Sequence, residues 1–316
     1  MEQMYHKSID SKTQPILFEL PTGYNTNGLA TLMTDYQGLL LNDTLAEKLR
    51  LILSTFQDGF GMLDLKGTDS TLPGWRDFER ATAVVFDGKG SESKALFDVL
   101  VPIPVMPGHY YGISCKSRNT LNDTIRKGTV FTELSNSNRQ FWAEVNQAGI
   151  TEADVRLYPN EVGKAVLARL QRWQNAVSHL KGGNIVLNKS FFLTLSYNIK
   201  QQYQLHQFSH ELPAADELRW EFPQSKNSKD KTSKRLVGYQ EDSVLFEWYF
   251  DKSGGQLKYY PRVAASLWQS SIFQLEPLKF VTNVKAAITQ KVESYFPEKW
   301  KALHITDKSD TPNRVP

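Results

Sequence analysis

The sequence has a single cysteine, Cys115, among its 316 residues. One cysteine excludes a disulfide within the chain, and it also excludes a zinc site built from several cysteines. Chains without disulfides are typical of reducing compartments, so we expect a cytoplasmic protein. No histidine follows Cys115 at a spacing typical of a catalytic pair, and we therefore predict that its side chain packs as a small apolar group in the core.

Long apolar runs are missing as well. Residues 1–14 are polar and lack the apolar segment of a signal peptide, and no uninterrupted apolar run approaches the ~20 residues that span a bilayer. We therefore expect neither secretion nor a membrane partner. Internal repeats and low-complexity tracts are also absent from the sequence.

The composition that remains is typical of a globular protein with a substantial core, with 40% hydrophobic and 22% charged residues. The formal net charge of +3 permits a polyanionic partner without requiring one. Helical spacing dominates up to residue 180, and short runs of aromatic and β-branched residues dominate after it. We therefore expect a helical arm and a core over residues 1–180, and a β-rich region with a C-terminal helix over residues 181–316, packed as one unit with the core.

Two apolar runs flank a turn rich in proline and glycine between Phe97 and Arg118. Residues 97–101 and 110–116 have the composition of strands, whereas the residues between them cannot continue a strand ladder. The pattern predicts a β-hairpin. Because side chains alternate along a strand, Ser114 and Lys116 are expected to share one face, away from the core.

Asp98 is the only ionisable residue in the first of these strands. A carboxylate among hydrophobic residues costs free energy unless it is hydrogen-bonded, paired with a cation or bound to a metal. One interpretation is an ordinary cross-strand ion pair between Asp98 and Lys116, with Ser114 as a bystander. The other interpretation is a catalytic site. Upstream, residues 74–86 have apolar residues at helical spacing and carry a further acid, Glu79.

A helix with Glu79, a strand with Asp98 and a strand with Ser114-Cys115-Lys116 resemble, in that order, the PD-(D/E)xK nucleases. The pattern is most similar to the type II restriction endonucleases in which serine replaces the second acid. Phe97 stands where the family has proline, and the resemblance covers roughly residues 74–118. It implies an α/β fold, in which a restriction-endonuclease-like core of a mixed sheet is flanked by helices and followed by a β-rich C-terminal extension.

The resemblance also implies a Mg²⁺ site. Hydrolysis of a phosphodiester needs a hard divalent cation held by carboxylate oxygens, and Asp98 is the first expected ligand. Lys116 would orient or deprotonate the attacking water and stabilise the developing negative charge, while Ser114 would hold a metal-bound water. Because Ser114 replaces the second acid of the motif, the metal site needs another carboxylate ligand. Glu79 and Glu133 are the two candidates for the missing ligand, and we favour Glu79.

Several cations are candidates for contacts with the DNA backbone. Such contacts confer affinity without sequence information. Solvated surface charge is the alternative role for each of them. The candidates near the hairpin are Arg118, Arg126 and Lys127, and those in the basic run of residues 226–235 are Lys229, Lys231, Lys234 and Arg235.

Two histidines, His206 and His210, stand four residues apart and would share one face of a helix. They are not part of an H-E-x-x-H motif, and no third ligand follows. We therefore interpret them as surface histidines without a metal.

Together these features predict a Mg²⁺-dependent type II restriction endonuclease, a homodimer that cleaves double-stranded DNA at a specific sequence. Two alternatives remain open. In one, the protein binds DNA or another partner without catalysis, and Asp98 and Lys116 form only a salt bridge. In the other, it is a repair nuclease of the same fold that recognises DNA structure rather than sequence.

Overall fold

The computed structural model describes residues 39–309, apart from residues 91–95, 136, 225–233, 251–255 and 280–285. The N-terminal arm expected from the sequence lies outside these ranges. The described chain begins with helix α2 (Asp43–Ser54), which Asn42 caps by accepting a hydrogen bond from the backbone amide of Leu45 at 2.8 Å. Two short strands, β1 (Leu63–Asp64) and β2 (Thr71–Leu72), lead from it to helix α3 (Trp75–Val85).

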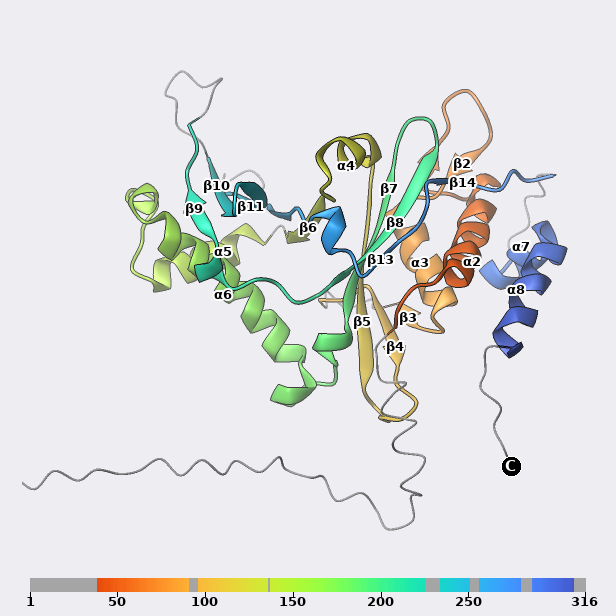
Figure 1. Ribbon diagram of the computed structural model, residues 1–316, viewed down its shortest axis with the longest axis horizontal. Helices are drawn as coiled ribbons and strands as arrows, with labels where there is room; N and C mark the ends of the chain where they lie inside the picture. Colours follow the sequence, from red (N-terminus) through yellow and green to blue (C-terminus); the bar gives the residue numbers. More distant parts are fainter. Residues whose placement is uncertain are drawn as a thin grey trace, which may run out of the picture. The chain divides into compact units, whose positions relative to one another are not determined.

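A seven-stranded mixed sheet forms the centre of the described chain (Figure 1). Its order is β13-β8-β7-β5-β4-β3, with β14 also paired to β8. Strands β5 and β7 run parallel and the other neighbours are antiparallel, which confirms the α/β class with a mixed sheet. The strands are β3 (Lys89–Gly90), β4 (Val99–Pro102), β5 (Tyr110–Arg118), β7 (Phe191–Tyr197), β8 (Gln202–Ser209), β13 (Trp268–Gln269) and β14 (Phe273–Gln274).

A second sheet of five antiparallel strands has the order β6-β12-β11-β10-β9. In both sheets, strands from before residue 180 pair with strands from after it, as β5 does with β7 and β6 does with β12. The two segments expected from the sequence therefore do not form separate sheets. The strands are β6 (Thr132–Ser135), β9 (Arg219–Glu221), β10 (Arg235–Gln240), β11 (Ser243–Tyr249) and β12 (Leu257–Tyr259).

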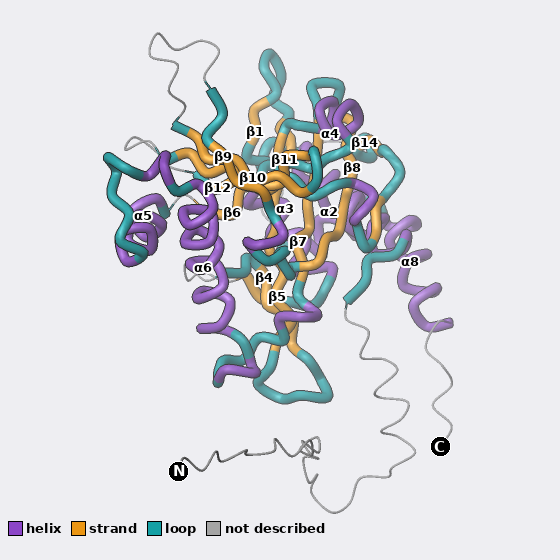
Figure 2. Tube along the Cα trace, turned by 60° about the vertical axis from the view of Figure 1, so that its left-hand side comes forward, coloured by secondary structure: helices purple, strands orange, loops and turns teal. Residues whose placement is uncertain are grey.

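Helices cover the two sheets in separate groups. Helices α2 and α3 pack on each other, and α3 also packs on β3, β4 and β5. Helices α5 (Asn138–Gln147) and α6 (Pro159–Val177) lie beside the five-stranded sheet in both views (Figures 1 and 2). The short helix α4 (Leu121–Lys127) packs on β7 and β8.

One hydrophobic core joins the second sheet, helix α6 and the central sheet. Val166 and Leu170 of α6 belong to the same buried cluster as Trp248 of β11 and as Phe192 and Phe208 of the central sheet. The apolar residues of α6 thus share one core with both sheets.

The C-terminal helices α7 (Ile288–Tyr295) and α8 (Pro297–Ser309) pack against α2. The ammonium group of Lys291 lies 2.6 Å from Oδ2 of Asp58, and both side chains are buried. The hydroxyl of Tyr295 donates to the same oxygen at 3.3 Å. These contacts attach α7 to the segment that follows α2.

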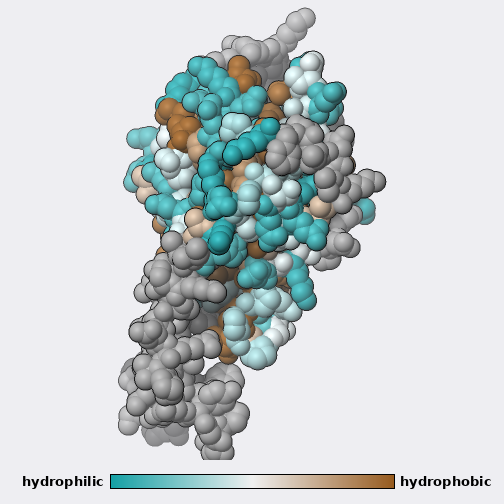
Figure 3. All heavy atoms as spheres, turned by 90° about the vertical axis from the view of Figure 1, so that its right-hand side faces the viewer, coloured by the Kyte–Doolittle hydropathy of each residue, from teal (hydrophilic) through white to brown (hydrophobic). Residues whose placement is uncertain are grey.

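The surface on the side of α7 and α8 is mostly hydrophilic, with hydrophobic residues gathered in small groups (Figure 3). Among the described residues, none of the helices combines the length and the apolar character that crossing a bilayer requires.

Candidate active site

The hairpin predicted from the sequence is confirmed, and it is built from β4 and β5. Val99 pairs with Ile113 and Val101 pairs with Tyr111, so the proline-rich turn is the connection between the two strands. Cys115 is buried, as expected. A Cβ atom on Gly112 would lie 2.3 Å from the ring of Phe97, the residue before Asp98. Position 112 therefore requires glycine, because the backbone of β5 passes too close to this ring to leave room for a side chain.

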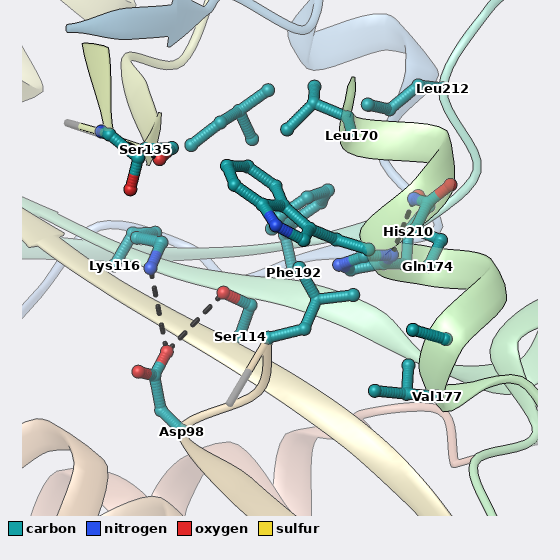
Figure 4. Close-up of a pocket in the computed structure, with 15 residues that line it drawn as sticks. Asp98, Ser114, Lys116, Ser135, Leu170, Gln174, Val177, Phe192, His210 and Leu212 are labelled. Carbon is teal, nitrogen blue, oxygen red and sulfur yellow. Dashed lines mark hydrogen bonds and ion pairs between the residues drawn. The ribbon is translucent and has the colours of Figure 1, made fainter. Parts of the chain in front are cut away.

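Asp98 is the residue before β4. Its backbone amide donates a hydrogen bond to the carbonyl of Ile113 at 3.0 Å, which continues the pairing of β4 with β5 by one residue. Its Oδ2 atom accepts a hydrogen bond from the backbone amide of Cys115 at 2.7 Å and lies 3.4 Å from the Ser114 hydroxyl. The ammonium group of Lys116 is 3.6 Å from the same oxygen (Figure 4). The three side chains therefore meet at one point on one face of the sheet.

Solvent reaches this group unequally. The side chains of Asp98 and Lys116 are 27% and 24% exposed, whereas Ser114 is buried. A half-buried ion pair with one backbone and one hydroxyl donor holds the carboxylate in one orientation while a ligand can still approach it. The geometry agrees with a cross-strand ion pair, and it equally provides an oxygen ligand beside a cation.

Helix α3 brings Glu79 into electrostatic range of the hairpin. Burial raises the pKa of Glu79 to about 7, and the negative charge of Asp98 adds to this effect against the opposing charges of Lys116, Arg76 and Arg80. The start of the helix is fixed by Asp77, whose buried carboxylate accepts from the backbone amides of Gly74 at 2.9 Å and Met62 at 2.8 Å. The helical acid of the sequence pattern is thus coupled to Asp98 through space.

The donor set at this point suits Mg²⁺. Among the residues that the structure describes, no three His, Cys, Asp or Glu side chains gather in a metal-binding group. Mg²⁺ is commonly held by only one or two carboxylates, with waters as its other ligands. Burial and the charge of Asp98 both disfavour the ionised form of Glu79, and a divalent cation held by the two carboxylates would offset this. Ser114 adds a neutral oxygen.

Glu133, the other candidate ligand, has a different partner. It lies on β6 and its carboxylate accepts from the guanidinium of Arg118. No contact between Glu133 and Asp98 is found in the described part of the chain. The charge of Asp98 thus acts on Glu79, whereas the partner found for Glu133 is Arg118.

The candidate cations for DNA contacts are engaged within the chain wherever the structure describes their side-chain partners. Arg118 is paired with Glu133, as described above. Arg126 and Lys127 both form ion pairs with Asp123 of the same helix, with nitrogen–oxygen distances of 2.5 and 3.5 Å. Arg235 lies 2.6 Å from Glu247, and Lys234 is an exposed neighbour of β10. Lys229 and Lys231 lie outside the described residues. The pairs that Arg126 and Lys127 make with Asp123 are exposed, and because such pairs are weak, a phosphate could replace this acid.

No family model, curated protein or solved structure matches the chain. A function can therefore be assigned only from the geometry and chemistry of the site.

A cavity of about 330 Å³ opens beside the three hairpin side chains. Asp98, Ser114 and Lys116 line one part of it, and Gln174 and His210 line the other end (Figure 4). Helix α6 supplies more of its lining residues than any other element does. The sequence alone does not reveal this cavity, because its residues come from segments far apart in the chain and share no local pattern. Its apolar lining consists of Leu96, Leu134, Leu170, Trp173, Ala176, Val177, Phe192 and Leu212.

The interpretation of His206 and His210 as surface histidines is wrong. Both are buried, and they lie on and just after strand β8 rather than on a helix. Neither ring nitrogen of His206 has a hydrogen-bond partner among the described residues, and burial lowers its pKa to about 4. Polar and apolar residues alternate from Gln202 to His206, which is the local pattern of a strand rather than a helix.

Proposed function

We propose that this protein is a Mg²⁺-dependent endodeoxyribonuclease of the PD-(D/E)xK type, and more specifically a type II restriction endonuclease. The observation that carries the proposal is the meeting of Ser114 and Lys116 at one oxygen of Asp98, with the carboxylate of Glu79 coupled to it. The order of elements supports it as well. A helix with Glu79 followed by a hairpin with Asp98 and Lys116 resembles the order of elements in that family.

Asp98 and Glu79 would hold the ion. When bound, Mg²⁺ supplies positive charge at the scissile phosphate and lowers the pKa of the water that attacks it. The Cys115 amide and the Ser114 hydroxyl hold the Asp98 carboxylate in one orientation. Lys116 donates a hydrogen bond to the attacking water or to a non-bridging phosphate oxygen, where negative charge develops.

Plasmid cleavage tests the proposal directly. The full chain is incubated with a panel of plasmids in Mg²⁺ or in EDTA, and the products are separated on a gel and their ends sequenced. We expect discrete fragments with constant ends in Mg²⁺ alone. The variants Lys116→Ala and Asp98→Ala should cleave nothing detectable while still binding DNA, because both side chains act at the reacting phosphate. Lys301→Ala, which removes an exposed cation of α8, is the control and should cleave normally. Intact plasmid under every condition would contradict the proposal.

A non-catalytic DNA-binding protein is the second candidate. It is favoured by the ion pair that Lys116 already makes with Asp98. A mobility shift that is the same in Mg²⁺ and EDTA, without cleavage, would establish it. Mg²⁺-dependent cleavage with ends that vary from molecule to molecule would instead indicate a repair nuclease that recognises DNA structure.

A further inference from the structure

The cavity beside the catalytic side chains has a composition that packing alone does not explain. Protein interiors are close-packed, and an opening of about 330 Å³ with eight apolar lining residues leaves apolar surface in contact with water. Well-formed openings of this size are typical of binding sites for small organic groups. The cavity lies between helix α6 and the face of the central sheet that carries Ser114 and Lys116.

The polar end of the cavity is chemically defined. The Gln174 side-chain nitrogen lies 3.1 Å from the backbone carbonyl of His210, and because a carbonyl only accepts, this atom must be the NH₂ group. The same NH₂ group lies 3.1 Å from Nδ1 of His210, which therefore accepts and leaves the ring proton on Nε2. Burial, together with the positive charge of Lys116, lowers the pKa of His210 to about 3, so the ring is neutral.

This arrangement leaves one hydrogen-bond donor and one acceptor without a partner among the described residues. No described residue makes a hydrogen bond to Nε2 of His210 or to the carbonyl oxygen of Gln174. The His210 ring is held in place by Phe192, which stacks on it at 4.5 Å, and by Phe97 at 4.6 Å. Both polar side chains are more than nine-tenths buried and line the cavity. A neutral N–H donor and an amide acceptor are the groups that bind the hydrogen-bonding edge of a nucleobase.

The walls and the opposite end fit the rest of a nucleotide. Phe192 and Trp173 provide aromatic rings, and Leu170 and Leu134 add apolar surface, which suits the faces of a planar heterocycle. Lys116 at the other end suits a phosphate. We infer that this cavity binds the base of the nucleotide whose phosphate lies at Asp98 and Lys116, with the base turned out of the double helix. The inference depends on the proposed nuclease function, since that function places a DNA phosphate at Asp98 and Lys116.

Saturation-transfer NMR on the full chain in EDTA tests the inference without catalysis. The probes are dAMP, dCMP, dGMP and dTMP, with 2-deoxyribose 5-phosphate as the phosphate-only comparison. We expect at least one of the four nucleotides to bind more tightly than the sugar phosphate, and its base protons to receive more saturation than its sugar protons. This method detects weak binding, so the absence of base saturation for all four nucleotides would overturn the inference.

Two substitutions on the exposed side of α6 form a matched pair of test and control. Ala176 is exposed and lines the cavity, whereas its neighbour Asn175 is exposed and does not. Ala176→Trp should weaken nucleotide binding by roughly tenfold, because the new ring occupies the place of a stacked base. Asn175→Trp should leave binding unchanged. Equal binding by the two variants would place the nucleotide elsewhere and would overturn the inference.

The result of the nucleotide-binding experiment can be distinguished from the result of the plasmid-cleavage experiment. Base-specific binding by a protein that cuts no plasmid would retain the nucleobase cavity and remove the nuclease assignment. Mg²⁺-dependent cleavage by a protein that shows no base saturation would keep the nuclease and overturn the cavity's role.

Discussion

At the scale of single residues, the site is defined by the carboxylate of Asp98 and by Glu79, whose ionised form is destabilised by burial and by the charge of Asp98. Asp98 is fixed by three donors, whereas Glu79 keeps its proton up to a pH near 7 because it is partly buried beside Asp98. Such shifts are common where side chains perform chemistry, since the same charges that strain the free protein bind a cation or a phosphate.

The raised pKa of Glu79 predicts how the stability of the metal-free protein depends on pH. Because the folded pKa of about 7 exceeds the ordinary value of 4.5, the contribution to stability is fully present below pH 4.5 and is lost as the pH rises through 7. Glu79→Gln should therefore raise the melting temperature in EDTA at pH 8 and change it little at pH 4.5. Thermal unfolding at the two pH values measures this, and an equal effect at both would show that the carboxylate is not strained.

Mg²⁺ should stabilise the folded protein through the same two acids. A ligand that binds only the native state adds about 2.7 kcal/mol at about a hundredfold excess over its Kd. We expect Mg²⁺ to raise the melting temperature of the wild type and to leave that of Asp98→Ala unchanged. Asp123→Ala, which removes an exposed acid of α4, is the control and should respond as the wild type does. A Mg²⁺ response that survives in Asp98→Ala would place the ion elsewhere.

At the scale of elements, helix α7 is held by one buried ion pair. Removing one partner of such a pair leaves the other charge buried and unpaired, which costs about 3–5 kcal/mol. Lys291→Ala should therefore reduce the free energy of unfolding by about that amount, because it leaves the fully buried Asp58 without its cation.

Lys299→Ala is the matched control for Lys291→Ala. Lys299 lies 2.7 Å from Glu276, but its side chain is 51% exposed, and pairs of this kind contribute about 1 kcal/mol or less. Chemical denaturation measures both variants. Equal losses would show that burial of the Asp58 pair adds nothing to the attachment of α7.

At the scale of the whole molecule, the buried histidines make stability fall on the acid side. The folded pKa of His206 is about 4, below the ordinary 6.5, so the unfolded chain binds the proton more tightly. Stability is therefore fully present above pH 6.5 and declines as the pH falls toward 4, with a loss of about 2 kcal/mol at pH 5 from this residue. His206→Leu should unfold with a shallower dependence on pH between 6.5 and 4, and an unchanged profile would contradict this account. His210 acts in the same direction.

Oligomeric state is the second property of the whole molecule that the proposal predicts. Two strands of a duplex are most simply cut by two copies of one site related by a two-fold axis. We therefore expect sedimentation to show a homodimer on double-stranded DNA. A single copy on DNA that still cuts both strands would exclude this arrangement.

The sequence by itself determined the local part of the site. Alternation along residues 110–116 placed Ser114 and Lys116 on one face, and the lone acid of the preceding strand identified Asp98 as their partner. The structure brings these three side chains together as expected. Their grouping follows from two strands joined by one turn, so the short-range period of a strand was enough to predict it.

Only the tertiary structure decided what surrounds this hairpin. The parallel partner of β5 begins at Phe191, and the cavity takes residues from α6 and from the end of β8. Glu79 is coupled to Asp98, while Glu133 is bound to Arg118 on the second sheet. The histidines at 206 and 210 became buried because β8 packs between neighbouring strands and the shared core. Each of these contacts joins residues distant in sequence, and such contacts depend on how the elements pack rather than on the periodicity within any one of them.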